Sequence, residues 1–425
     1  MPWAALALVS ADLLRATLGA MTPYYDVAVT GEANRLGQYR STVSAGATSS
    51  SMTHSESMQL SPSLGLGYGD RVLDFNARYS PTLRWSSGAG SNLSGLQGGS
   101  IATSWHMTRR SSATATLTGS YGTRDFWADA APPGEAGTAQ QPEAQAMPSL
   151  RTIKIVSVDL STGFNASVGP KAGIGFGLGA FVNGGLGSES AAALPMTRGG
   201  RASTSVGWSV SRSDAIGTSL NASITQFTGS DVLDGIANLG LNWRHSISPG
   251  TPSLVQAITG GELGLSSSFG LSLGAAYTME REDGVTTWAL LPTARAELSG
   301  RLRAPVLTGS VSLGVTPFLD RLTLAVYQRA DAGAGLTWSP SASWSFGLNA
   351  HSGWPLGAGQ DGQRVVSSEF RVGWSPDRAM VVFCGVRGAW QEATGQQARD
   401  AAAVATSYKS WSAFVGLSFR THERF

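Results

Sequence analysis

The stretch that decides the fold is LDFNARYSPTLRW, at residues 73–85. Its odd-numbered positions are apolar from Leu73 to Trp85, and every even-numbered position between them is polar. A period of two places alternate side chains on opposite faces of a β-strand. This segment therefore predicts a strand with one face in an apolar medium and the other in water.

The same alternation recurs along the chain. It is found at residues 202–210, 263–277, 307–315 and 411–419, where Phe414 is the one apolar residue on a polar face. These phases run for about 10–17 residues, whereas strands of soluble proteins have about 5–6. A soluble β-sandwich also alternates, but here the polar faces carry Ser, Gly, Thr and Asn rather than Lys and Glu. The pattern favours tilted membrane strands.

Composition excludes several other classes. The chain has 54 glycines among 425 residues, and only 14% of its residues are charged. Thirty basic against 28 acidic residues give a formal charge of +2, which argues against a nucleic-acid binder. No apolar run reaches 18 residues, so helical membrane spans are not expected. The single cysteine, Cys384, excludes an internal disulfide.

We predict an all-β fold, a transmembrane antiparallel up-and-down β-barrel of about 18 strands, with 16 to 20 left open. The predicted strands are 38–48, 57–69, 71–86, 92–108, 112–127, 150–168, 172–187, 200–211, 214–228, 234–247, 262–281, 285–300, 303–318, 321–338, 341–354, 363–375, 377–391 and 407–421. With both termini periplasmic, the three longest outer loops are 128–149, 188–199 and 392–406. Residues 246–261 become a periplasmic connection, with a short helix at 254–258.

The two ends of the chain carry their own signals. Residues 3–11 end in Val-Ser-Ala, like the tail of a signal peptide, so we assign residues 1–37 to a signal-peptide remnant and a periplasmic lead-in. The barrel then occupies residues 38–425. Bacterial barrels often end in an aromatic residue after alternating apolar positions, which the barrel-assembly machinery reads. The predicted signal consists of Val415, Leu417, Phe419 and Phe425.

Tryptophans in the outward phase predict aromatic girdles at the two lipid interfaces. They are Trp85, Trp208, Trp243, Trp338, Trp344, Trp374 and Trp411. The expected surroundings are outer-membrane lipid and lipopolysaccharide.

The opposite phase predicts the side chains that line the pore. Its charges are Asp74, Arg78, Arg84, Asp159, Arg244, Glu262, Arg295, Glu297, Arg329, Asp331, Glu369, Arg371 and Arg387. Several opposite charges lie two residues apart on one strand face, so they neutralise one another locally. They either brace the wall or set up a mild field across an aqueous pore.

Nothing in the sequence predicts catalysis, a cofactor or a metal site. The five histidines have no zinc-binding spacing, and His106 lies on the inner phase beside Ser104. The glycine-rich runs at 65–69 and 173–179 resemble phosphate loops, but no helix pattern follows them. We therefore expect a protein that is not an enzyme.

In its architecture the whole chain resembles the porin-like superfamily of Gram-negative outer membranes. One group that it resembles comprises the roughly 18-stranded porins that accompany polysaccharide secretion and work with a separate periplasmic export protein. The resemblance implies a channel for hydrophilic, largely uncharged solutes, with polysaccharide export favoured. The alternatives are a general or sugar-specific diffusion porin and a non-conducting structural or adhesive barrel.

Overall fold

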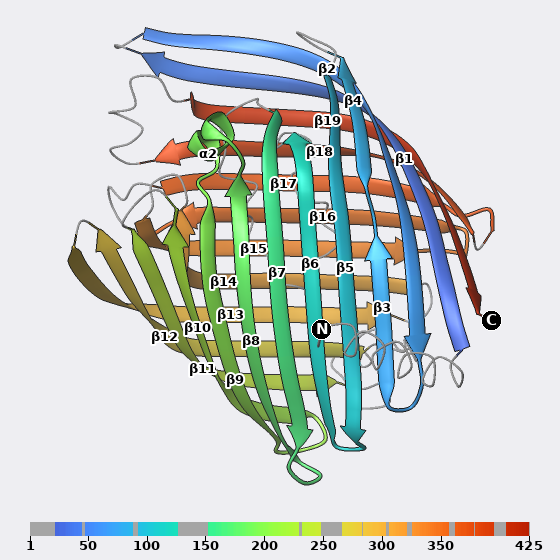
Figure 1. The fold of residues 1–425 in the computed structure, drawn as a ribbon, viewed down its shortest axis with the longest axis vertical. Helices are drawn as coiled ribbons and strands as arrows, with labels where there is room; N and C mark the ends of the chain where they lie inside the picture. Colours follow the sequence, from blue (N-terminus) through green and yellow to red (C-terminus); the bar gives the residue numbers. More distant parts are fainter. Residues whose placement is uncertain are drawn as a thin grey trace, which may run out of the picture.

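The computed structural model describes residues 22–44, 47–87, 92–125, 152–228, 232–247, 266–282, 284–302, 306–320, 325–356, 362–377, 379–394 and 405–424. In these residues the chain forms one antiparallel sheet that closes on itself, because β1 (Thr22–Ser44) pairs with both β2 (Ala47–Gly69) and β19 (Ala405–Arg424) (Figure 1). Nineteen strand segments form this sheet. The predicted barrel is confirmed.

Two of the segments, β3 (Leu73–Tyr79) and β4 (Thr82–Ser87), make a single barrel strand. Both pair with β2 on one side and with β5 (Asn92–Thr108) on the other, so the described residues form 18 barrel strands, as the alternation predicted. The break falls at Ser80 and Pro81, inside the stretch that decides the fold. Proline has no backbone N–H to give to the ladder, and it interrupts the pairing there.

The remaining strands follow in up-and-down order, each paired with the next along the chain. They are β6 (Ser111–Asp125), β7 (Thr152–Ser167), β8 (Ala172–Gly185), β9 (Thr197–Ser209), β10 (Asp214–Phe227), β11 (Leu233–Ile247), β12 (Ser266–Glu282), β13 (Val285–Leu302), β14 (Val306–Asp320), β15 (Ala325–Ser339), β16 (Trp344–Pro355), β17 (Gly362–Trp374) and β18 (Met380–Thr394).

The connections define two rims. The rim that carries Thr22 and Arg424, here called the terminal rim, has short turns such as 109–110, 168–171 and 210–213. The opposite rim, here called the loop rim, carries the connection with helix α2 (Ser188–Ala193). The part of the chain that the structure describes holds no helix long and apolar enough to cross a bilayer.

The start of the barrel differs from the prediction. β1 begins at Thr22 rather than at residue 38, so residues 22–37 are a barrel strand and not a lead-in. β2 begins at Ala47, so residues 49–56, which we placed between two predicted strands, belong to a strand. Arg35 on the outward phase of β1 and the serines of β2 interrupt the alternation, but the two strands pair along their whole length. Backbone hydrogen bonds, which need no apolar side chain, hold them there.

Other predicted segments shift or lie outside the described residues. Loop 188–199 contains α2, and β9 already begins at Thr197. The strand predicted at 321–338 begins at Ala325, and the strand predicted at 262–281 is described from Ser266. Residues 1–21, loop 128–149, the connection at 248–261 with its predicted helix, residues 395–404 and Phe425 lie outside the described residues.

Candidate functional site

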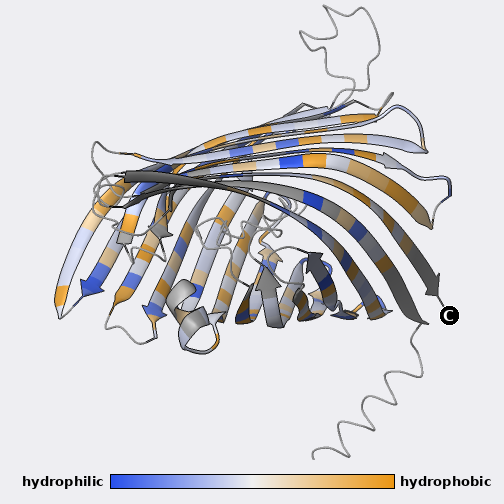
Figure 2. Ribbon diagram, turned by 90° about the horizontal axis from the view of Figure 1, so that it is seen from above, coloured by the Kyte–Doolittle hydropathy of each residue, from blue (hydrophilic) through white to orange (hydrophobic). Residues whose placement is uncertain are grey.

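The two faces of the barrel wall differ sharply in chemistry. Large apolar side chains in one phase are exposed, for example Leu178 at 66% and Leu290 at 70%. The other phase holds charged side chains that the concave wall buries, such as Arg84 at 6% and Glu369 at 8%. Figure 2 shows the hydrophobic and hydrophilic residues alternating along the strands. The apolar phase therefore faces outward and the polar phase faces the lumen.

All seven predicted interface tryptophans are exposed on the outward phase. Trp208, Trp243, Trp338, Trp344 and Trp374 lie within five residues of the terminal-rim ends of their strands, and Trp105, which we did not predict, lies there too. Trp85 lies near the loop rim, and Trp411 lies well inside β19. Exposed Trp288 and Trp354 lie near the loop-rim ends of their strands, so both rims carry tryptophans. Their contact with lipid stays a prediction.

One part of the inner wall, spanning β17, β18, β19 and β1, carries a compact group of charged and aromatic side chains. We call it the charged wall; its members are Glu32, Glu369, Arg371, Phe383, Arg387, Ser412 and Phe414. The Arg387 guanidinium donates to Glu32 Oε1 and, at 3.1 Å, to Ser412 Oγ. Arg387 also lies directly across from Glu369 on the neighbouring strand. Its charge is thus shared between two carboxylates.

Two phenylalanines of the charged wall explain the exception at Phe414. Phe383 pairs across strands with Gly416, and Phe414 pairs with Gly385. Each ring lies over its glycine, because a Cβ built at Gly416 would meet Phe383 and one at Gly385 would meet Phe414. Arg371 stacks on Phe383 at 4.0 Å, and Arg387 lies 4.7 Å from the centre of Phe414. The rings thereby cover backbone and hold both guanidinium groups.

A second such group lies on β14–β16. Arg329 is 7% exposed, forms an ion pair with Asp331 at 2.8 Å and stacks on Phe318 at 3.9 Å. His351 lies 3.7 Å from the same carboxylate. The sequence predicted the Arg329–Asp331 pair, but not Phe318 or His351.

The structure places the other predicted lumen charges as follows. Arg295 and Glu297 form a long pair at 3.8 Å, and Arg84 donates to Ser57 at 2.9 Å. Arg78 donates to Ser63 at 3.3 Å. Asp159 pairs at 2.5 Å with Arg201, a lumen residue that we did not predict. Asp74 pairs at 3.2 Å with His106, Arg244 is an exposed residue of the inner phase, and Glu262 lies outside the described residues.

Two partners, Glu32 and Arg201, were missed for different reasons. Glu32 stands in a strand that we began too late. Arg201 lies within the predicted strand 200–211 on the polar phase of Ser203 and Ser205, so the sequence already contained its phase. The cross-strand register places Glu32 opposite Gly416 and Arg201 opposite Gly179.

The wall formed by β5–β9 is of a different kind. A polar hollow of about 500 Å³ lies there at the terminal rim. Its lining includes Gly173, Gly175, Gly207, Ser205 and Asn165, and the turn residues Arg109 and Arg110 border it. Small inner-phase residues on β8 and β9, namely Gly173, Gly175, Ser205 and Gly207, make room for the hollow.

Helix α2 packs against the inner phase at the loop rim. Leu194, just after the helix, is buried with Ile153 and Ile155, and Leu96 packs against them. Lys154 N donates to Ser190 Oγ at 3.1 Å, which ties the helix to β7. The chain after β8 therefore narrows the lumen at this rim.

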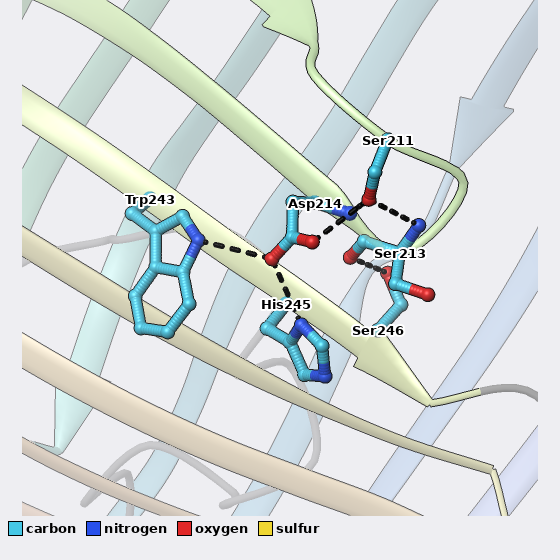
Figure 3. Close-up of polar contacts among 6 residues, drawn as sticks. All are labelled: Ser211, Ser213, Asp214, Trp243, His245 and Ser246. Atoms are coloured by element: carbon cyan, nitrogen blue, oxygen red, sulfur yellow. Dashed lines mark hydrogen bonds and ion pairs between the residues drawn. The ribbon is translucent and has the colours of Figure 1, made fainter.

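Ser211, Asp214 and His245 meet at the terminal rim, and their residue types suggest a catalytic triad. Ser211 donates to Asp214 at 2.8 Å, and His245 Nδ1 lies 2.9 Å from the same carboxylate (Figure 3). Trp243 Nε1 also donates to Asp214, at 3.3 Å. A nucleophile must contact its base, but here the serine contacts the acid. The group braces the turn between β9 and β10.

Comparison with protein families links the whole barrel to one family. Residues 26–423 match the EpsX exopolysaccharide export family. A comparison with curated proteins finds no significant match.

Solved structures with a similar course of the chain are outer-membrane proteins. The chain is similar to outer membrane protein OpdK of Pseudomonas aeruginosa (TM-score 0.46, 9% identity, covering 94% of this chain and 99% of that one). It is also similar to OccK5 of the same organism (0.44, 8%, 93% and 98%) and to OccAB1 of Acinetobacter baumannii (0.42, 10%, 92% and 96%). These likenesses are architectural and carry no inference about solute or direction.

Proposed function

Because the chain belongs to the EpsX exopolysaccharide export family, we propose that it is the outer-membrane channel through which a polysaccharide leaves the cell. The observation that carries the proposal is the pairing of this family with a closed barrel whose inner face is hydroxyl-rich and balanced in charge. Serine, threonine and asparagine side chains hydrogen-bond to sugar hydroxyl groups without holding an ion. A wall whose charges largely cancel neither traps nor repels a polymer that carries few charges of its own.

The barrel needs a partner for this task. The described residues form the barrel wall and a six-residue helix, and neither supplies a means to move a polymer. We propose that a periplasmic export protein delivers the polymer at the terminal rim, which then faces the periplasm. Outer-membrane lipid and lipopolysaccharide would surround the outward phase, and the barrel-assembly machinery would read Val415, Leu417 and Phe419, which lie on that phase.

Deletion of the gene tests the export function. We expect surface polysaccharide to disappear while the cells stay intact, and re-expression of the full chain to restore it. Unchanged polysaccharide would remove the proposal. If deletion instead slowed the uptake of small sugars, the protein would be a diffusion porin.

A second measurement separates a channel from a structural barrel. The purified barrel in planar bilayers should conduct, either alone or only after the periplasmic partner is added. Absence of conductance in both conditions, together with intact polysaccharide in the deletion strain, would leave the structural or adhesive role.

A further inference from the structure

The polar hollow on the β5–β9 wall has the features of a binding site. Its volume of about 500 Å³ falls within the range of roughly 300–1,000 Å³ typical of ligand sites. The side chains of Ser112, Asn165 and Ser205 come from three different strands and line the same space. At Gly175 a Cβ would lie 2.7 Å from Ser205 Oγ and 3.0 Å from Asn165 Oδ1, so these two polar groups converge over the glycine.

Two glycines form the floor of the hollow, and no side chain fills the space above them. Gly173 and Gly207 are cross-strand partners, and a Cβ at either position would meet no atom closer than 3.7 Å. Neither position has the left-handed backbone conformation that would require glycine. The hollow therefore results from the absent side chains, and a larger residue would fill it without moving the strands.

Two arginines border the hollow on a rigid turn. Arg110 N donates to Thr108 Oγ1 at 3.1 Å, and Ser167 N donates to the Arg110 carbonyl at 2.7 Å, which ties the turn to β7. Arg109 and Arg110 are both exposed, and neither forms an ion pair with a described residue. The nearby Asp74 carboxylate is engaged by His106, which itself lines the hollow.

Basic residues continue along the same rim. Each of the four consecutive turns from β2 to β10 carries at least one of Arg71, Arg109, Arg110, Lys171 and Arg212. Against these five cations stand the Asp70 and Asp214 carboxylates, which accept hydrogen bonds from the amides of Val72 and Leu73 and from Ser211 and Trp243. The local field at this part of the rim is therefore positive.

We propose that the hollow binds a saccharide unit bearing an anionic group, a carboxylate or a phosphate, at the entrance to the lumen. Arg109 and Arg110 would pair with the anion, and Ser112, Asn165 and Ser205 would hydrogen-bond to the sugar hydroxyl groups. That this saccharide belongs to the exported polymer rests on the proposed function. A lipid headgroup fits the position less well, because the lining side chains lie on the inner phase.

The test is binding to the purified full-length barrel in nanodiscs of zwitterionic lipid, measured by calorimetry. The anionic probe is oligogalacturonate, and the neutral probe is a dextran oligomer of matched length. We expect the anionic probe to bind more tightly. The double variant R109A/R110A should weaken it about tenfold or more. Gly207→Phe should weaken it similarly by filling the hollow.

The control is Arg212→Ala, which removes one cation of the same basic rim that does not line the hollow, so binding should weaken by less than about twofold. Heat-modifiability on gels checks that each variant is folded. Equal affinity for both probes would overturn the proposal, as would equal losses in Arg212→Ala and R109A/R110A. If R109A/R110A instead lost affinity for phosphatidylglycerol vesicles and no variant bound oligogalacturonate, the arginines would hold lipid headgroups, and the proposal would fail.

This experiment is independent of export. Anionic-probe binding with unchanged polysaccharide after gene deletion would keep the site and remove the proposed function. Lost polysaccharide after deletion, without probe binding by the barrel, would do the reverse.

Discussion

The charged wall and the hollow of the β5–β9 wall line the same lumen, but they treat charge in opposite ways. On the charged wall Arg387 lies between Glu32 and Glu369, and aromatic rings hold the guanidinium groups. Beside the hollow Arg109 and Arg110 have no carboxylate partner among the described residues, and the strands contribute glycine and serine. Where aromatic side chains pack against a guanidinium group, as on the charged wall, the group is held in the wall. Where the neighbouring residues are small, as beside the hollow, the guanidinium group is open to a solute.

Arg387→Ala should produce the largest effect. It leaves Glu32 and Glu369 without their shared cation, and removing one partner of a largely buried pair costs about 3 kcal/mol. Heat-modifiability on gels should show unfolding at a lower temperature. The matched control is Arg295→Ala, whose pair with Glu297 is more than half exposed and should contribute less than about 1 kcal/mol. Equal losses in both variants would contradict the comparison.

Phe414→Ala should follow in size. Phe414 is 6% exposed, so its loss removes burial worth about 2 kcal/mol and uncovers Gly385. The same gel assay measures the loss, and the double variant with Arg387→Ala should be less than additive because the two side chains touch. Strict additivity would show that the ring does not hold the arginine.

Substitutions on the two walls should change the ion selectivity of the pore in opposite directions. Replacing Glu297 and Glu369 with glutamine leaves the partner arginines in excess and shifts the pore toward anions, whereas R109A/R110A shifts it toward cations. A unit charge at 4 Å in water contributes about 1 kcal/mol, so each permeability ratio should change by at most roughly fivefold for each charge removed. Reversal potentials in planar bilayers under a salt gradient measure both. Shifts in the same direction would refute the assignment of the inner faces.

The smallest effect concerns Asp70, beside Arg71 in the turn between β2 and β3. Hydrogen bonds from the amides of Leu73 and Val72, and from the Tyr68 hydroxyl, lower the pKa of the Asp70 carboxyl. The stability that the ionised Asp70 carboxylate gives to the turn is therefore fully present above the ordinary pKa of about 4 and is lost as the pH falls through the lowered pKa. Hydrogen exchange of the Val72 and Leu73 amides should lose protection there. In Asp70→Asn, which cannot ionise, protection should not change with pH.

The barrel, its inner and outer faces and a count of about 18 strands, with 16 to 20 left open, follow from the sequence alone. A long period of two such as that over Leu73–Trp85 suits a strand between lipid and water, and the same phase assigned seven tryptophans to the outer face and set Arg329 and Asp331 together on the inner one. The pattern failed at Thr22–Gly37, because the alternation over residues 25–34 is short and Arg35 interrupts its outward phase.

Only the tertiary structure decided which charges meet. Glu32 and Arg387 are 355 positions apart, and only closure of β1 onto β19 brings them together. The Phe414–Gly385 contact and the hollow around Gly207 depend likewise on cross-strand register. Alternation assigns each residue to a face of the sheet. Which residues lie opposite it on the neighbouring strands depends on strand register, and the pattern along a single strand carries no information about register.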